Sequence, residues 1–428
     1  MNSWVISANE PDCGFPLQNL PFCAFRQSAS EVHLGVGIGS LILDLHKTSV
    51  AGLLKDQASK VIQACQSPHL NDLMSCGEDA CSSLRKKMMD LLISSAPPET
   101  QNTLSEFLIP QADVTFCSPV LVQNYTDFYA SIEHATNVGR LFRPDQPLLP
   151  NYVHIPIAYH GRASSIVRSG EPIYRPFGQL KSPADPEPRY APSAQLDYEL
   201  EIGAYIGIQN ELGRPVPIRS AESHIFGFCL LNDWSARDIQ SWEYQPLGPF
   251  LGKNFGTTIS PWVIVRDALA PYRVPRVERS REHPQPLAYL NDGSPETLSA
   301  IDMTLEVYLQ TAAMKASKTE PYLISRGNLS KLFWSFAQMV AHHTSNGCNL
   351  QVGDLLGSGT VSGADTGSEG SFLERTHRGT DRIELSTGES RAFLEDGDEI
   401  ILRGYCARPD LPRISLGECR GIIHPPRS

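Results

Sequence analysis

Apolar residues alternate with polar ones, or form short continuous runs, over much of the chain, and this pattern predicts β-strands rather than long helices. The strands expected from it lie at 22–26, 31–45, 196–206, 225–232, 262–265 and 303–310. Within the second of these, Gly35, Gly37 and Gly39 superficially resemble a nucleotide-binding loop. The third glycine is misplaced for G-x-G-x-x-G and an alternating apolar run follows, so we expect a strand–turn–strand hairpin instead.

Apolar residues with helical spacing occur in fewer places, at 51–65, 81–94 and 124–139. A further helix is expected to open at Asn328 and to run to about His343, because its apolar residues fall on one face. That face holds Leu329, Leu332, Phe333, Phe336 and Val340.

Proline clusters indicate how the chain is organised. The Pro97-Pro98 pair interrupts the N-terminal pattern, and we expect a domain boundary near Ser118. The chain then divides into a small domain, residues 1–118, and a large β-rich domain, residues 119–428. Two proline-rich segments, 171–192 and 271–286, are predicted as surface loops or hairpin excursions of the large domain. The fold class expected is mostly β, in the α+β sense.

The acidic balance of the chain narrows the classes of partner. Its 428 residues include 36 Lys and Arg against 47 Asp and Glu, a formal net charge of −11. This argues against a dedicated nucleic-acid-binding protein and against binding to anionic membranes. No apolar run approaches the roughly 18 residues of a membrane span, and no secretory signal is visible. The ten scattered cysteines form no C-x-x-C pair, so we expect reduced thiols and a cytoplasmic location.

The segment 196–202 carries an acidic face. If it is one continuous strand, Asp197, Glu199 and Glu201 point to the side opposite its apolar residues. One interpretation is a half-exposed strand whose acidic face is solvated. The other is a pair of carboxylates that grip a cation, because like charges this close need a cation or a proton to coexist.

A second group of polar residues follows the apolar run 225–232. Asp233 is a good helix N-cap residue. If a helix follows it, Asp233, Arg237, Gln240 and Tyr244 are spaced by four, three and four positions and form one polar stripe. A carboxylate, a guanidinium, an amide and a phenol on one face are typical of a binding wall. Trp234 and Trp242 are expected to pack in the core.

Two further positions have both an ordinary and a chemical interpretation. Lys253 stands in a glycine-flanked loop that lacks the order of a phosphate-binding P-loop, and is either solvated or part of a site. Asp127 and His134 are seven positions apart, and so share a face if 124–139 is helical throughout. They are either a capping Asp and a surface His, or a metal ligand and a general base.

The candidate ligands are all carboxylates. No Cys or usable pair of His lies near them, since the adjacent His342 and His343 point to different faces of a helix. All-oxygen sites suit Mg²⁺ or Ca²⁺ rather than zinc or copper. Arg237 and Lys253 could offset the remaining negative charge.

Six segments of the chain resemble the fumarylacetoacetate hydrolase family. They are 127–129, 134–139, 159–165, 197–201, 231–240 and 252–257, and the resemblance spans nearly the whole chain. It implies a small SH3-like β-barrel domain followed by a β-rich catalytic domain, a homodimer, and a divalent-metal site. The activity it implies is hydrolytic carbon–carbon cleavage of a small diketo acid, 4-fumarylacetoacetate, to fumarate and acetoacetate, the last step of tyrosine and phenylalanine catabolism.

The resemblance also implies roles for individual residues. The metal ligands would be Asp127, Glu199, Glu201 and Asp233, with Lys253 and Thr257 at a second Mg²⁺ position; a protonated Lys could contribute only its backbone carbonyl there. His134 would be the base that activates water, and Glu374 would orient it. Arg237, Gln240 and Lys253 would stabilise the developing oxyanion. The substrate-binding positions would be Tyr129, Arg143, Tyr159, Gln240, Tyr244 and Thr360. The segment 363–369 departs from the family pattern, whereas the register of 370–374 agrees with it.

Two alternatives remain open. One is another enzyme of the same superfamily, such as an acylpyruvate hydrolase or a decarboxylase. Three features favour fumarylacetoacetate hydrolysis over such a related activity: the N-terminal domain, the segment 127–134 and Glu374. The other is a catalytically silent homologue that acts as a binding protein, against which the presence of His134, Lys253 and the metal carboxylates argues.

Overall fold

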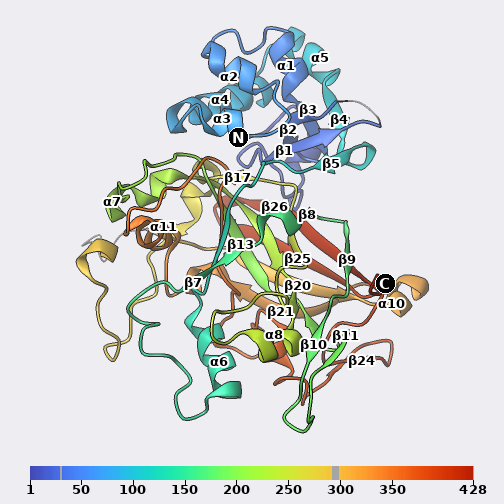
Figure 1. Ribbon diagram of the computed structural model, residues 1–428. Helices are drawn as coiled ribbons and strands as arrows, with labels where there is room; N and C mark the ends of the chain where they lie inside the picture. The colour runs from blue at the N-terminus through green and yellow to red at the C-terminus, as the bar shows by residue number, and fades with distance from the viewer. Residues whose placement is uncertain (29–30, 292–297, 428) are drawn as a thin grey trace.

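The computed structural model describes residues 1–28, 31–291 and 298–427, and places a small N-terminal part on top of a larger β-rich part (Figure 1). The N-terminal part contains an antiparallel five-stranded sheet in the order β4-β3-β2-β1-β5. Its strands are β1 Phe22–Arg26, β2 His33–Ile38, β3 Leu41–Asp44, β4 Leu108–Pro110 and β5 Thr115–Cys117. The predicted hairpin is confirmed, since β2 pairs directly with β3 and Gly39 takes a positive φ of 57° in the turn.

Helices cover this sheet. They are α1 Leu45–Val50, α2 Ser59–Ala64, α3 Asn71–Met74, α4 Glu78–Leu92 and α5 Pro98–Ser105, with 3₁₀ turns η1 Ile6–Asn9 and η2 Gln111–Asp113. The helix predicted at 81–94 corresponds to α4, which buries Leu84, Met88 and Leu92 on one face. The helix predicted at 51–65 was too long: only α2 forms, and turns occupy the residues before it.

The larger part is built on two sheets. The first, in the order β7-β6-β22-β13-β14-β16-β8 with β17 paired to β14, holds the site described below. The second has the order β21-β20-β25-β26-β9. The strands of the first are β6 Tyr125–Phe128, β7 Ala158–Gly161, β8 Ile166–Arg168, β13 Leu200–Ile206, β14 Ile225–Asp233, β16 Thr257–Ile259, β17 Ile264–Val265 and β22 Leu355–Gly357. Those of the second are β9 Pro172–Tyr174, β20 Thr304–Gln310, β21 Tyr322–Asn328, β25 Glu399–Arg408 and β26 Leu411–His424.

Short elements connect these sheets. Two-stranded ribbons pair β10 Phe177–Leu180 with β11 Arg189–Pro192, β12 Leu196–Asp197 with β15 Ser235–Ala236, β18 Arg273–Val274 with β19 Ala300–Ile301, and β23 Ile383–Glu384 with β24 Ser390–Arg391. The helices are α6 Ile132–Phe142, α7 Ile218–Ala221, α8 Arg237–Glu243, α9 Arg266–Leu269, α10 Ala312–Ser317, α11 Phe336–Thr344 and α12 Phe372–Arg375. The 3₁₀ turns are η3 Ala163–Ser165, η4 Glu222–His224, η5 Ala270–Tyr272, η6 Ala288–Leu290 and η7 Leu329–Lys331.

Three further predicted elements differ from the structure. The helix expected from Asn328 begins only at Phe336, because β21 runs to Asn328 and Ser335 forms a capping box with Gln338. The helix expected over 124–139 is a strand, β6, followed by α6. The strand expected at 196–206 is interrupted between β12 and β13, and both of its faces are buried. The idea of a solvated acidic face at 197–201 was therefore wrong.

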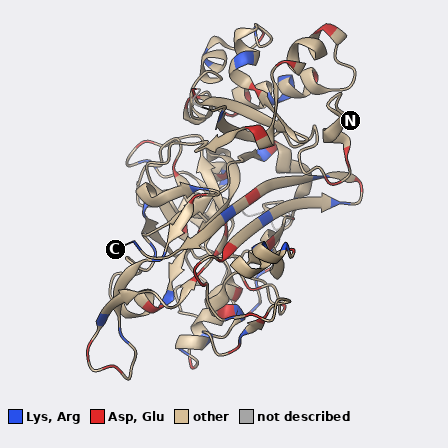
Figure 2. Ribbon diagram, turned by 90° about the vertical axis from the view of Figure 1, so that its right-hand side faces the viewer, with Lys and Arg blue, Asp and Glu red and all other residues tan. Residues whose placement is uncertain are grey.

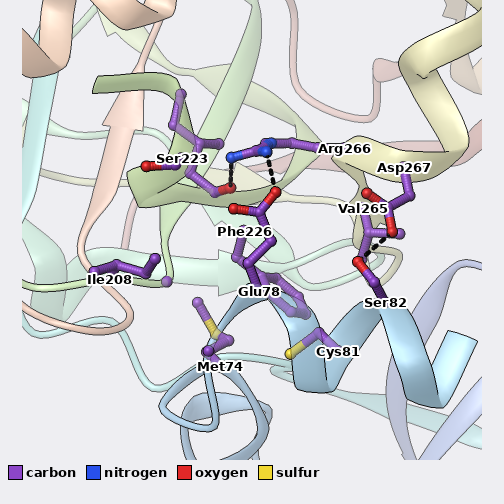
Figure 3. A pocket seen from close by; sticks show the side chains of 13 residues that line it. Met74, Glu78, Cys81, Ser82, Ile208, Ser223, Phe226, Val265, Arg266 and Asp267 are labelled. Carbon is purple, nitrogen blue, oxygen red and sulfur yellow. Dashed lines mark hydrogen bonds and ion pairs between the residues drawn. The ribbon is translucent and has the colours of Figure 1, made fainter. Parts of the chain in front are cut away.

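The two parts of the chain are tied together at α4. Glu78 pairs with Arg266 at 2.5 Å, and the Ser82 hydroxyl donates to Asp267 at 2.5 Å, beside a cavity of about 40 Å³ (Figure 3). Phe22 of β1 also exchanges backbone hydrogen bonds with Val263. One continuous cluster of buried apolar side chains runs through both parts.

Acidic and basic residues are interspersed along the ribbon in the view of Figure 2. Within the described ranges, no helix combines the length and apolarity that crossing a membrane would need.

Candidate metal centre and active site

Four carboxylates converge at the middle of the larger sheet. Asp127 lies on β6, Glu199 lies just before β13, Glu201 lies on β13, and Asp233 is the last residue of β14. One oxygen of each lies within 4.8 Å of the others, and none of the four residues is more than 5% exposed. The predicted set of carboxylate ligands is thus brought together in space.

Gly357 of β22 makes room for this convergence. It lies opposite Asp127 in the parallel pairing of β22 with β6. A Cβ atom at this position would lie 2.6 Å from Asp127 Oδ1 and 2.8 Å from Glu201 Oε2. Any side chain here would therefore fill the space between the two carboxylates.

The chemistry of this cluster fits a hard divalent cation. Asp127 Oδ1 and Glu201 Oε1 are buried without a hydrogen-bond partner. Burial and the neighbouring carboxylates raise the pKa of Asp127 and of Glu201 well above their ordinary values. A bound cation would give the unpartnered oxygens a partner and would offset both the lost solvation and the repulsion between the carboxylates. An all-oxygen donor set suits Mg²⁺ or Ca²⁺.

Two buried cations already neutralise part of the cluster. Lys253 Nζ lies 2.5 Å from Glu199 Oε2 and 2.9 Å from Asp233 Oδ2, and Arg237 Nη1 lies 2.6 Å from Glu199 Oε1. Burial alone would raise the pKa of Glu199, but Lys253 and Arg237 lower it below its ordinary value. These two cations therefore favour the ionised form of Glu199 even without a metal.

Lys253 and Thr257, the residues predicted at a second metal position, both contact Asp233. Burial alone would lower the pKa of Lys253, but Asp233 and Glu199 raise it, so the ammonium stays protonated and has no lone pair to donate. The Thr257 hydroxyl donates to Asp233 Oδ1 at 3.0 Å. The side chain of Lys253 contacts two of the four carboxylates, Glu199 and Asp233.

His134 and Glu374 form a buried pair beside this cluster. His134 Nδ1 lies 2.6 Å from Glu374 Oε2, which also accepts hydrogen bonds from Ser362 and Ser371, while Oε1 accepts one from Asn137. Burial alone would raise the pKa of Glu374, but its interaction with His134 and the hydrogen bonds from Asn137 and Ser371 lower it. An ionised carboxylate thus holds the Nδ1–H of the imidazole.

His134 reaches its position from α6, not from a helix shared with Asp127. Ser131 caps α6 by accepting the backbone N–H of His134 at 3.3 Å. Asp127 lies on β6, so the predicted common helical face does not exist. The two residues still reach one site: His134 is close enough to Glu199 to help lower the pKa of that carboxyl.

The polar stripe predicted at 233–244 is only partly helical. Asp233 belongs to β14 and caps no helix, while α8 begins at Arg237. Arg237 Nη1 donates to Gln240 Oε1 at 3.2 Å, so this part of the stripe is confirmed. Tyr244 lies at the end of α8 and is 37% exposed. Of the two tryptophans, Trp234 is buried as expected, but the prediction for Trp242 was wrong, since it is 43% exposed.

The remaining candidate residues surround the pair and the cluster. The Tyr129 ring packs edge-on against His134 at 5.3 Å, and the Tyr159 hydroxyl donates to Asp233 Oδ2 at 2.8 Å. Thr360 Oγ1 and Arg143 Nε are buried without a partner. Arg143 is close enough to Tyr129 to act on its pKa.

Sequence reasoning missed two contributors. Gly357 and Tyr125, whose buried hydroxyl has no partner, adjoin the carboxylates. Neither residue type carries a spacing signal, because each is brought to the site by the pairing of β6 with β22.

Comparisons with known proteins agree with this geometry. A family model described as fumarylacetoacetate (FAA) hydrolase C-terminal matches residues 123–421, and one described as fumarylacetoacetase N-terminal matches residues 18–119. The chain is 44% identical to fumarylacetoacetase of Rattus norvegicus over 420 residues, which are 97% of each chain. It is 45% identical to fumarylacetoacetase of Emericella nidulans, with 100% of this chain and 99% of that one covered.

A solved structure shows that the fold is shared more widely. It is a fumarylacetoacetate hydrolase from psychrophilic Exiguobacterium antarcticum, with a TM-score of 0.53 and 16% identity over 95% of this chain and 100% of that chain. At this identity the likeness concerns the fold alone. From the two family models and the full-length relatives, we conclude that the chain belongs to the fumarylacetoacetate hydrolase family.

Proposed function

We propose that this protein hydrolyses a carbon–carbon bond of 4-fumarylacetoacetate to yield fumarate and acetoacetate, the closing step of tyrosine and phenylalanine breakdown. The observation that carries the proposal is the buried His134–Glu374 pair beside four converging carboxylates, in a chain 44% identical to fumarylacetoacetase over nearly its full length. A base next to a cation site is what hydrolysis of a 1,3-diketone needs.

Asp127, Glu199, Glu201 and Asp233 would hold one divalent cation, Mg²⁺ or Ca²⁺. The unpartnered oxygens of Asp127 and Glu201 support this role. When bound, the cation would supply Lewis-acid polarisation of the diketone oxygens. Thr257 would orient Asp233 through its hydroxyl, and Lys253 and Thr257 would border a second Mg²⁺ position.

His134 would act as the general base. Glu374 accepts the Nδ1–H, so Nε2 carries the free lone pair and can take a proton from water. The carboxylate would also stabilise the imidazolium that forms, as orienting carboxylates do in other hydrolases. The water so activated would attack the carbonyl carbon next to the fumaryl group. The bond from that carbon to the acetoacetate part would then break with its electron pair, and the departing carbon would take up the proton held on His134.

Arg237, Gln240 and Lys253 would stabilise the oxyanion that develops in this attack. Arg237 Nη2 is buried without a partner, and is therefore available to a developing negative charge. Tyr129, Arg143, Tyr159, Gln240, Tyr244 and Thr360 would bind the substrate. The Arg143 guanidinium would pair with a substrate carboxylate.

Assembly and location are further parts of the proposal. We propose a homodimer with a small N-terminal SH3-like domain, residues 1–118, and a catalytic domain, residues 119–428, in the cytoplasm. The ten cysteines are all free, as is usual in a reducing compartment. The acidic net charge of −11 disfavours nucleic acid and anionic membranes as partners.

The experiment is direct. The purified protein is incubated with 4-fumarylacetoacetate and Mg²⁺, with a chelator as control, and fumarate and acetoacetate are quantified. Metal-dependent formation of both in equal amounts is expected. Turnover of another acylpyruvate, release of CO₂, or metal binding without turnover would replace the proposal with the related hydrolase, the decarboxylase or the silent homologue, respectively.

A further inference from the structure

Asp197 is a buried carboxylate that is not among the four converging ones. It is 0% exposed and lies at the end of β12. Its Oδ1 accepts the backbone N–H groups of Tyr198 and Phe372, both at 2.8 Å. Its Oδ2 accepts the backbone N–H of Leu373 and the Nε–H of Arg237, both at 2.9 Å.

The partners of Asp197 are themselves bonded to two groups of proposed catalytic residues. On one side, Arg237 forms an ion pair with Glu199 at 2.6 Å and donates a hydrogen bond to Gln240 at 3.2 Å. On the other side, Phe372 and Leu373 immediately precede Glu374 in α12, and Glu374 holds His134 at 2.6 Å. One side chain is therefore hydrogen-bonded both to the proposed oxyanion-binding arginine and to the backbone that carries the partner of the proposed base.

We propose that Asp197 is a positioning residue that keeps Arg237 and the Glu374–His134 pair in register with each other. This inference rests on the function proposed above, and Asp197 itself touches no reacting atom in it. The base and the oxyanion donor act on the same tetrahedral centre, so their separation must hold as the reaction proceeds. A misplacement of about 1 Å costs on the order of a hundredfold in rate.

Only a carboxylate satisfies these four donors. An ionised carboxylate is purely an acceptor and offers lone pairs on both oxygens. In an Asp197→Asn variant, one acceptor becomes an NH₂ group. If the NH₂ replaces Oδ2, it faces the donors of Leu373 and Arg237; if it replaces Oδ1, it faces those of Tyr198 and Phe372. Either orientation sets donor against donor: the first releases Arg237 and leaves α12 with Phe372 alone, whereas the second removes the contact with Phe372 and leaves α12 with Leu373 alone.

A matched control exists elsewhere in the same part of the protein. Asp398 is 1% exposed, accepts from Arg391 at 2.9 and 3.1 Å, and accepts the backbone N–H of Glu395 at 2.9 Å. Asp398→Asn breaks an equivalent buried carboxylate–arginine pair whose partners are not site residues. The Asp398→Asn variant therefore measures how much stability is lost when a buried carboxylate–arginine pair is broken away from the site.

The test compares wild type, Asp197→Asn, Asp197→Glu and Asp398→Asn in thermal unfolding and in steady-state hydrolysis of fumarylacetoacetate. For Asp197→Asn we expect kcat to fall by roughly a hundredfold with KM within about threefold of wild type. Asp398→Asn should keep kcat within about twofold at a similar loss of Tm. Asp197→Glu restores two acceptor oxygens and should recover part of kcat.

A double-mutant cycle with Glu374→Gln separates positioning from general destabilisation. If Asp197 acts through Glu374, adding Asp197→Asn to Glu374→Gln should lower kcat far less than it does in the wild type. Equal losses in both backgrounds, or a kcat of Asp197→Asn that follows its Tm as in Asp398→Asn, would overturn the inference. A wild-type protein without turnover would refute the proposed function instead, and the two failures are therefore distinguishable.

Discussion

His134 Nδ1 and Glu374 Oε2 lie 2.6 Å apart, although 240 positions separate the two residues in the chain. The contact forms because α6 packs against α12. It leaves Nε2 of the imidazole as the free, basic nitrogen. Four experiments test the consequences of this pair and of the neighbouring carboxylates.

Replacing the base should abolish turnover without unfolding the protein. We expect His134→Ala to lower kcat by at least about a hundredfold, the usual contribution of a general base. Its affinity for Mg²⁺ should stay close to that of wild type, because His134 is not among the converging carboxylates. Steady-state kinetics and calorimetry measure the two quantities. Near-normal turnover would remove His134 as the base.

Replacing its partner should change stability in a pH-dependent way. The folded-state pKa of Glu374 is lowered, so its ionisation stabilises the fold above the ordinary Glu pKa of about 4.3, and this stabilisation is lost as the pH falls through the lower folded value. Urea unfolding of wild type and Glu374→Gln should therefore show a difference at pH 7 that shrinks in acid. A difference that grows on acidification would contradict the lowered pKa.

Removing a carboxylate of the cluster should weaken metal binding. We expect Asp233→Ala to lower Mg²⁺ or Ca²⁺ affinity by at least about tenfold in titration calorimetry. Asp238→Ala is the matched control, since the Asp238 carboxylate accepts from Ser193 and Ala194 outside the cluster. Unchanged affinity in the first variant would exclude Asp233 as a ligand.

Lys253 should oppose metal binding while supporting catalysis. Its ammonium lies against Glu199 and Asp233, so Lys253→Met leaves the buried Asp233 without its cation and leaves Glu199 with Arg237 alone. We expect the metal-free variant to have a lower Tm than wild type, and Mg²⁺ to raise that Tm again. We also expect the variant to bind Mg²⁺ more tightly than wild type does. We also expect slower turnover because one proposed oxyanion donor is lost. Weaker metal binding would show that Lys253 supports the metal instead.

The spacing of apolar residues along the sequence correctly predicted several strands and one helix. Alternation identified the β2–β3 hairpin, a continuous apolar run identified β14, and helical spacing identified α4. The same rules failed at 124–139, where apolar residues of β6 and of α6 form one apparent helical pattern, and at 328–343, where a 3₁₀ turn and irregular residues precede α11. In both places a serine, Ser131 or Ser335, caps the real helix. At 124–139, the pairing of strands in the tertiary structure outweighed the apparent helical spacing.

Residue types and spacing indicated which side chains could take part in the chemistry: the acidic residues of 197–201, Asp233 with Arg237, and Lys253. The family resemblance added the pairing of His134 with Glu374. How these side chains lie relative to one another depends on the packing of the sheets. The pairing of β6, β22 and β13 brings Asp127 to Glu201, and Gly357 leaves the space between them. The tertiary structure also places Asp197 against Arg237 and α12, and not in the carboxylate cluster that its spacing suggested. Sequence periodicity records which face a residue occupies, whereas contacts between distant strands depend on how whole sheets are packed.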